Sequence, residues 1–275
     1  MRTLAWIPAL LIPTVVLSAA DPASNPDHTL KLSLRTRVET FKGSGVWDEV
    51  VVPHELHGDE TAVIICDTWD NHWCPTAAAR CAELAKKMPP VLDALRARGV
   101  LIVHAPSECM DFYKDAPQRK RIQEAKRIDP PAPLDLSDPP LPCDSSDGGC
   151  DADPPAKFYK AWTRENAAVP IADQDVISDD GKEIYSYLKQ RGVKSVLFMG
   201  VHANMCVLNR TFAIKQMTKW GMHCVLVRDL TDAMYNPKMK PFVSHEDGTE
   251  RIIEHIEKYW CPSVLSADLV KGMSR

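Results

Sequence analysis

The hydrophobic residues of this chain are concentrated in short, separated runs. The continuous apolar runs are Ala62 to Cys66, Val100 to Val103, Val196 to Met199 and Cys224 to Val227, with Phe158 to Trp162 as a further candidate. Short apolar runs of this kind are typical of parallel strands that are covered on both faces. They predict the strands of a central sheet.

Segments of helical character separate these runs. The predicted helices are Pro75 to Arg98 with an interruption at Pro89-Pro90, Gln118 to Arg127, 178–190, Cys206 to Trp220 and Gly248 to Tyr259. Pro75 suits the first turn of a helix, and Gly99 and Gly192 are suitable stops. Strands that alternate with helices predict an α/β fold, with an open, mostly parallel sheet flanked by helices on both faces.

The chain before residue 61 has a different pattern. Leu30, Leu32 and Leu34 alternate with polar residues, which is typical of a half-buried strand, and Val50 to Val52 can continue as a second strand. We therefore expect residues 21–60 to form an N-terminal β-ribbon extension.

The main domain is expected to span residues 61–275. Within it, residues 105–156 are rich in proline and charge. A segment of this length and composition predicts a long insertion that acts as a lid or cover, and we expect it to determine substrate specificity.

The first twenty residues have the features of a secretory signal peptide. Arg2 precedes an apolar run from Leu4 to Leu17, and small residues at 18–20 provide a cleavage site. An uncleaved membrane anchor is the alternative, but Pro8, Pro13 and the short run disfavour a full bilayer span. We expect a protein exported to the periplasm or beyond, with no membrane contact after cleavage of residues 1–20.

Composition excludes two classes of protein. The 275 residues are 45% hydrophobic and 25% charged, with a formal net charge of −4. This balance disfavours a basic nucleic-acid binder and a disordered chain.

The chain contains nine cysteines, of which eight can pair in an oxidising compartment. Cys143 and Cys150 flank a short loop that contains two glycines, so we predict a disulfide between them. The other pairings stay open.

Candidate chemistry gathers where the predicted strands end. Parallel strands place their carboxyl ends at one edge of the sheet, where ligands bind. Asp67, His104 and the segment that leads to Cys206 follow three of these strands. Cys206 is predicted to begin a helix, whose dipole would favour the thiolate. Cys206 is therefore the candidate nucleophile, with a buried core cysteine as the alternative.

Three segments also resemble a known family. Ala62 to Asp67 resembles the first strand and catalytic aspartate of the isochorismatase-like cysteine hydrolases, the superfamily that includes nicotinamidases. Gly200 to Val207 resembles its second signature, G-V-x-T-x-x-C-V, with Ala203 at the threonine position. Val225 to Ala233 is similar to the strand and D-A turn that follow. The resemblance covers residues 60–260.

The resemblance implies a Cys-Asp-Lys catalytic triad. Cys206 would attack a carbonyl carbon, and Asp67 would accept the thiol proton and pass it to the leaving amine. The backbone N–H groups of His202 and Cys206 would form the oxyanion hole. The family also implies a cis peptide bond between Val201 and His202.

Two residues compete for the place of the family lysine. Lys160, in Phe158-Tyr159-Lys160, has the right chemistry and resembles that segment in some nicotinamidases. Arg164 lies closer in sequence to Cys206, but a guanidinium cannot share a proton as an amine can. We prefer Lys160 and keep Arg164 as the alternative.

The residues expected to line the substrate pocket are Trp69, His72, His104, Trp162 and Asn204. The nicotinamidase metal motif D-x-H is replaced by residues 104–108, so the resemblance implies no metal and no other cofactor. A metal site built from His72, His104 and Glu108 stays open as an alternative.

The sequence therefore predicts an exported cysteine hydrolase that cleaves a small amide or related C–N bond. Its expected partners are a small-molecule substrate and further copies of itself in a homo-oligomer, without nucleic acid. The alternatives are a non-catalytic small-molecule binding protein on the same fold and a metal-dependent hydrolase that uses the histidines at the edge of the sheet.

Overall fold

The computed structural model describes residues 28–271, which build an eight-stranded sheet in the order β2-β1-β8-β7-β6-β3-β4-β5. The strands are β1 Thr29–Glu39, β2 Trp47–His57, β3 Thr61–Cys66, β4 Leu101–Ala105, β5 Val176–Ile177, β6 Ser195–Val201, β7 His223–Asp232 and β8 Ser263–Val264. β3 to β8 pair in parallel, whereas β1 is antiparallel to β2 and β8. The open, mostly parallel sheet and the N-terminal ribbon are confirmed.

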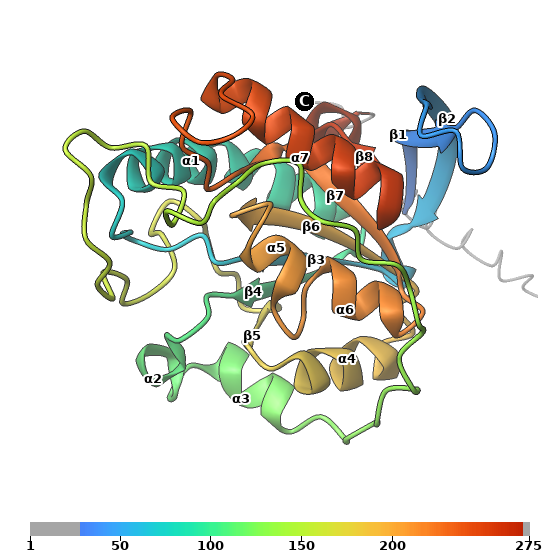
Figure 1. Cartoon of the computed structure of the whole chain (residues 1–275). Coiled ribbons are helices and arrows are strands. Elements are labelled where there is room, and N and C mark those ends of the chain that lie inside the picture. The colour runs from blue at the N-terminus through green and yellow to red at the C-terminus, as the bar shows by residue number, and fades with distance from the viewer. Residues whose placement is uncertain (1–27, 272–275) are drawn as a thin grey trace, which may run out of the picture.

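Helices cover both faces of the sheet (Figure 1). They are α1 Pro75–Ala97, α2 Met110–Tyr113, α3 Pro117–Gln123, α4 Gly181–Gln190, α5 Cys206–Asn209, α6 Ile214–Lys219, α7 His245–Tyr259 and α8 Ser266–Val270, with a 3-10 turn at Gly58–Glu60. Alternate residues of β3 serve the two faces: Ile64 packs in a core with α4, α6 and α7, and Ile65 in a core with α1 and α8. Within residues 28–271, no helix is both long and apolar enough to cross a membrane. The predicted signal peptide, residues 1–20, lies outside the described residues.

Three predicted elements differ from the structure. α1 continues through Pro89-Pro90, because its buried residues on both sides of the prolines keep packing against the sheet. The helix predicted over Cys206 to Trp220 is broken into α5 and α6. Phe158 to Trp162 forms no strand, and the edge of the sheet is β5 instead.

The proline-rich insertion wraps around the helices of one face. Ile128 donates from its backbone to Ser186 of α4, and Leu134 donates to the Lys219 carbonyl at the end of α6. The thiol of Cys143 contacts the carbonyl oxygen of Gly248 in α7. In Figure 1 this segment is the green-to-yellow chain that passes around α4 and α6 and then beside α7.

A buried carboxylate ties the ribbon to the body of the protein. The fully buried side chain of Glu257, in α7, accepts from Arg35 Nε at 2.7 Å and from Arg37 Nε at 3.1 Å. Both arginines belong to β1, so the ion pairs join the last long helix to the first strand. A buried carboxylate is tolerated because cations and hydrogen bonds compensate for its lost hydration.

A second buried network links β4 to the segment that follows the insertion. His104 Nδ1 lies 2.7 Å from Glu165, and its Nε2 lies 3.0 Å from Asp175. Arg96 of α1 contacts the same Asp175 oxygen at 2.6 Å. Burial by itself would lower the pKa of His104, but the two carboxylates outweigh it and raise that pKa to about 9. His104 is therefore a cationic structural residue near neutral pH.

The first prediction concerns the ribbon. Glu257→Ala should lower the free energy of unfolding by about 3 kcal/mol, because it leaves two arginines without their buried partner. Glu250→Ala is the matched control: Glu250 contacts the same Arg35, but its side chain is 45% exposed, so its loss should cost less than about 1 kcal/mol. Urea unfolding measures both. Equal effects of the two variants would contradict the role given to Glu257.

The second prediction concerns pH. Because the pKa of His104 is raised from 6.5 to about 9, its contribution to stability is full below pH 6.5 and is lost as pH rises through about 9. The stability gap between wild type and His104→Gln should therefore be wide near about pH 6 and narrow near about pH 10. Urea unfolding of both proteins across this range measures the gap. A gap that stays constant would show that His104 is uncharged in the folded protein.

Candidate functional site

The candidate site lies at the carboxyl edge of the sheet, where β3 and β6 end side by side. Asp67 follows β3, and Cys206 follows β6 after a short loop. Gly200 lets the two strands approach at this point, because a Cβ atom there would lie 2.0 Å from the carbonyl oxygen of Cys66. Its φ of 108° also favours glycine. This close approach brings the predicted acid and the predicted nucleophile together.

Asp67 is fully buried and has all of its partners within the site. Its Oδ1 accepts from the backbone N–H of Ser107 at 2.7 Å, and its Oδ2 accepts from Arg210 Nε at 2.9 Å. It also shares a side-chain hydrogen bond with the thiol of Cys206. The backbone of Asp67 has a φ of 45°, in the left-handed region, which is uncommon for residues other than glycine. The carboxylate is therefore held in place between a thiol and a cation.

The electrostatics of Cys206 differ from the prediction. Burial raises the pKa of its half-buried thiol, and the neighbouring charge of Asp67 raises it further. Burial also raises the pKa of Asp67, although Arg210 and the hydrogen bonds from Cys206 and Ser107 oppose this shift. A helix begins at Cys206 as predicted, but the predicted stabilisation of the thiolate was wrong, because α5 spans only Cys206–Asn209 and provides little dipole. In the resting site, therefore, the Cys206 thiol is protonated and lies beside the Asp67 carboxylate.

The loop before Cys206 provides a backbone donor to its sulfur. The N–H of His202 forms a hydrogen bond to the thiol sulfur. The peptide bond between Val201 and His202 is cis, which confirms that prediction. The His202 ring is buried, and burial together with His72 lowers its pKa to about 3. His202 is therefore neutral near neutral pH.

Neither predicted cation contacts Asp67. The exposed Lys160 donates from Nζ to the carbonyl oxygen of Glu108 at 2.8 Å. Arg164 lies over the ring of Phe112, and its Nε is 3.9 Å from Asp70. Lys160 lies in the segment that was predicted as a strand, and Arg164 follows that segment. Without a strand there, nothing directs their side chains toward the end of β3.

The cation that does contact Asp67 is Arg210, which the sequence analysis missed. It caps the carboxyl end of α5, four residues after Cys206. Its guanidinium Nη1 also lies 3.5 Å from Glu108. The i, i+4 spacing from the nucleophile was a signal that could have found it, but the family pattern directed attention to the upstream segment.

Aromatic side chains form one wall of the site. Trp69 and Trp162 stack with their ring centres 4.2 Å apart, and His72 is nearly parallel to Trp162 at 6.0 Å. The sulfur-bearing side chain of Cys206 packs against this cluster. Within the described residues, the buried Trp162 Nε1 and His202 Nε2 have no hydrogen-bond partner. Three predicted pocket residues therefore lie together near the thiol.

Of the other two predicted pocket residues, Asn204 lines the hollow beside Cys206 and also holds the backbone, whereas His104 does not reach the site. Asn204 is buried, and its side-chain amide both donates to and accepts from the backbone of Met234, at 2.9 and 2.8 Å. His104 is enclosed by Glu165 and Asp175, so the prediction that it faces the pocket was wrong.

An open hollow of about 460 Å³ gives access to the site. It is lined by Asn204, Met205, Cys206, Asn209 and Arg210.

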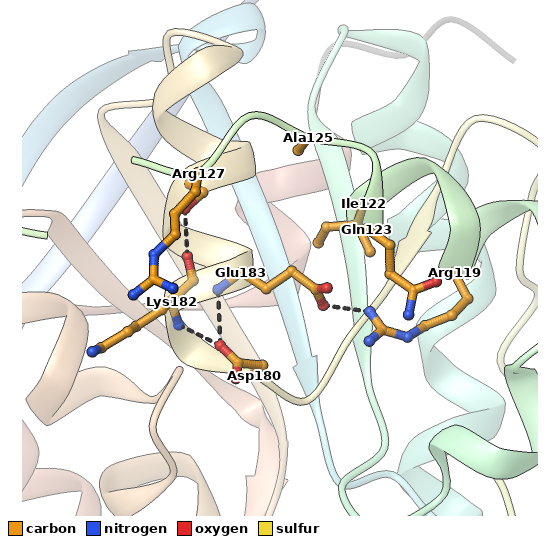
Figure 2. A pocket seen from close by; sticks show the side chains of 9 residues that line it. Arg119, Ile122, Gln123, Ala125, Arg127, Asp180, Lys182 and Glu183 are labelled. Carbon is orange, nitrogen blue, oxygen red and sulfur yellow. Dashed lines mark hydrogen bonds and ion pairs between the residues drawn. The ribbon is translucent and has the colours of Figure 1, made fainter. Parts of the chain in front are cut away.

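Figure 2 shows a different hollow, between α3 and α4, which has a volume of about 330 Å³. There, Arg119 pairs with Glu183, and Asp180 caps the first turn of α4. Arg119, Glu183 and Asp180 are thus engaged in these contacts, and no cysteine or histidine lines this hollow.

The predicted disulfide partner of Cys150 was wrong. Cys150 is bonded to Cys74, directly before α1, and Cys143 is a free, buried thiol. The turn at Gly148-Gly149 carries the chain toward α1: Gly149 touches the Met234 backbone so closely that a Cβ atom would lie 2.3 Å from its carbonyl oxygen. The bond anchors the end of the insertion beside His72, in the aromatic wall.

The alternative metal site is not assembled. Within residues 28–271, no three histidine, cysteine, aspartate or glutamate side chains are placed to hold a metal ion. His104 and Glu108, two of the three residues of that alternative, have other partners.

Comparisons with known proteins agree with this architecture. No family model and no curated protein matches the sequence, whereas 36 solved chains match the structure. A cysteine hydrolase from Pseudomonas syringae pv. phaseolicola 1448A has a TM-score of 0.50 and 16% identity, over 78% of this chain and 93% of that one. An isochorismatase from Pseudomonas putida KT2440 has a TM-score of 0.46 and 11% identity, over 77% and 91%.

Sequence identities this low are evidence of a shared fold only. The chemistry of the protein has to be inferred from the residues of its own site. The parallel sheet, its helices on both faces and the similarity to the solved cysteine hydrolase agree with the sequence motifs that end in Asp67 and Cys206. The chain therefore has the fold of the isochorismatase-like cysteine hydrolases.

Proposed function

We propose that the protein is a cysteine hydrolase that cleaves a small amide or a related C–N bond. The observation that carries this proposal is the hydrogen bond between the Cys206 thiol and the buried Asp67 carboxylate, with the His202 N–H beside the sulfur. A nucleophile within reach of a base, next to backbone donors, is the arrangement that acyl transfer requires.

The first half of the reaction forms a thioester. Asp67 accepts the thiol proton while the Cys206 sulfur attacks the carbonyl carbon of the substrate. The backbone N–H groups of His202 and Cys206 stabilise the negative charge that develops on the carbonyl oxygen. Asp67 then returns the proton to the leaving nitrogen, and the C–N bond breaks with release of the amine.

The second half of the reaction consumes water. Asp67 accepts a proton from a water molecule, which attacks the thioester carbonyl. The C–S bond breaks, the acid product leaves, and the proton on Asp67 returns to the Cys206 sulfur. The raised pKa of the thiol is compatible with this cycle, because the thiolate is needed only during attack, when Asp67 takes the proton.

The size and lining of the site favour a small substrate. The hollow at Cys206 has a volume of about 460 Å³, in the range of small-molecule sites. The stacked rings of Trp69 and Trp162 are buried and pack against Cys206 without lining that hollow. These features support a small amide as the substrate.

Export remains part of the proposal. The bond between Cys74 and Cys150 is consistent with folding in an oxidising compartment, where disulfides form and persist. The same bond holds the insertion close to the aromatic wall of the site, so export and site assembly are linked in this proposal.

A non-catalytic binding protein is the second candidate. The observation that favours it is the thiol itself, since burial and a neighbouring carboxylate both oppose its ionisation. Alkylation of the resting protein distinguishes the two candidates. A Cys206 that stays unmodified at every pH while the protein binds an amide and leaves it intact would favour binding alone.

The third prediction concerns the nucleophile. Cys206→Ala should abolish hydrolysis of every amide that the wild type cleaves, because it removes the sulfur that forms the thioester. Cys224→Ala is the matched control, since it removes a buried thiol at the opposite end of the parallel strands. Release of ammonia or amine from a panel of small amides measures activity. Turnover that persists in Cys206→Ala would refute the mechanism.

The fourth prediction concerns the acid limb of the pH profile. Asp67 must be ionised to accept the thiol proton, and its pKa is raised above 3.8. Therefore kcat/KM should fall as pH decreases through a value higher than that of an ordinary aspartate. Asp67→Asn should remove the activity. Asp70→Asn should leave the pH at which kcat/KM falls unchanged, because Asp70 binds Thr163 instead of the thiol. A fall of kcat/KM at the pKa of an ordinary aspartate would count against Asp67 as the base.

A further inference from the structure

The carboxylate of Asp67 needs a permanent positive charge beside it. A buried carboxylate without a cation would take up a proton and could not act as a base. Within residues 28–271, Arg210 is the only cationic side chain that forms an ion pair with Asp67, at 2.9 Å. Its side chain is 29% exposed, so one end reaches the hollow while Nε contacts the buried oxygen.

Arg210 is delivered by the same turn of chain as the nucleophile. The N–H of Arg210 donates to the carbonyl oxygen of Cys206 at 3.1 Å, which closes that turn. The helix ends at Arg210, whose backbone is extended, with a φ of −61° and a ψ of 159°. The backbone positions of Cys206 and Arg210 are thus fixed relative to each other by local structure.

Glu108 provides a second anchor for the guanidinium, 3.5 Å from Nη1. Its own backbone is held from two sides: its N–H donates to Asp179 at 2.9 Å, and its carbonyl oxygen accepts from Lys160 at 2.8 Å. The φ of Glu108 is 63°, in the left-handed region. Lys160 therefore acts on Glu108, one step removed from the pair of Arg210 and Asp67.

We infer that Arg210 is the catalytic cation of this site, that it replaces the family lysine from the nucleophile's own turn, and that Glu108 is its positioning residue. This inference rests on the proposed hydrolase function. Arg210 keeps its proton throughout, so the single mobile proton passes from Cys206 to Asp67 and then to the leaving nitrogen. The positive charge keeps Asp67 ionised before attack and offsets the charge of the sulfur when it ionises.

The test compares three cations in the full chain. Arg210→Ala should lower kcat/KM by about 10²- to 10³-fold, the loss typical of one preorganised charge or donor. Arg210→Lys should keep part of the activity, because it keeps the charge and loses the fork of donors. Arg164→Ala, the matched control, should stay within about threefold of wild type, since surface charges contribute little. Lys160→Ala removes one contact to the Glu108 backbone and should lower kcat/KM less than Arg210→Ala does.

A second readout needs no substrate. The rate of Cys206 alkylation by iodoacetamide, followed by peptide mass spectrometry across pH, reports ionisation of the thiol. At each pH, alkylation of Cys206 should be slower in Arg210→Ala than in wild type, because the cation that stabilises the thiolate is lost. Glu108→Gln should slow alkylation less, and Arg164→Ala should leave its rate unchanged.

The outcomes separate the two proposals. If Lys160→Ala loses activity as Arg210→Ala was expected to, while Arg210→Ala does not, the inference is overturned and the hydrolase stands. If no amide is cleaved but the alkylation profile depends on Arg210, the cation is assigned and the proposed reaction fails. Arg210→Lys guards against misfolding of the alanine variant, because a profile restored toward wild type in a folded protein shows that charge is the cause.

Discussion

A single buried carboxylate determines most of what surrounds it in this site. Asp67 has no exposed surface, and a charge in that position is stable only with hydrogen bonds and a cation nearby. The backbone of Ser107, in the loop after β4, and the guanidinium of Arg210 and the thiol of Cys206, both in the turn after β6, supply these partners. The loops after β3, β4 and β6 therefore meet at one point, and their conformations, including the left-handed backbone of Asp67 and Glu108, follow from that meeting.

The same constraint explains why the thiol is stored in its protonated form. A carboxylate and a thiolate in contact would place two negative charges in a buried space, and burial already disfavours each of them. The pair therefore holds one proton between two acceptors, and Arg210 supplies the charge that keeps the second acceptor usable. The cysteine of such a pair reacts when its proton passes to the carboxylate during attack, so it does not need to be exposed and ionised at rest. The neutral ring of His202 adds no competing proton carrier near neutral pH.

Sequence reasoning succeeded where local pattern and chain order carry the information. Apolar runs such as Ala62 to Cys66 predict buried parallel strands, and strand ends predict the edge that holds Asp67 and Cys206.

Sequence reasoning failed where the outcome depends on contacts between distant segments. Cys150 bonds to Cys74, 76 residues away, because a glycine turn directs it there, and short sequence separation suggested Cys143 instead. His104 has the strand-end position of a ligand-facing residue, but two carboxylates from residues 165 and 175 enclose it. The role of Lys160 was inferred from a strand that the chain does not form.

The position of Arg210 follows from that missing strand. When the segment around Phe158 to Trp162 does not pair with the sheet, it cannot carry a cation to the end of β3, and its backbone instead serves the wall through Trp162. The charge that Asp67 requires must then come from another element, and the turn that bears Cys206 supplies it through Arg210. An arginine is long enough to reach Asp67 from the end of that turn while a second nitrogen contacts Glu108. The absence of a strand at Phe158 to Trp162 and the ion pair between Arg210 and Asp67 are thus two parts of one arrangement that supplies a buried acid with a cation.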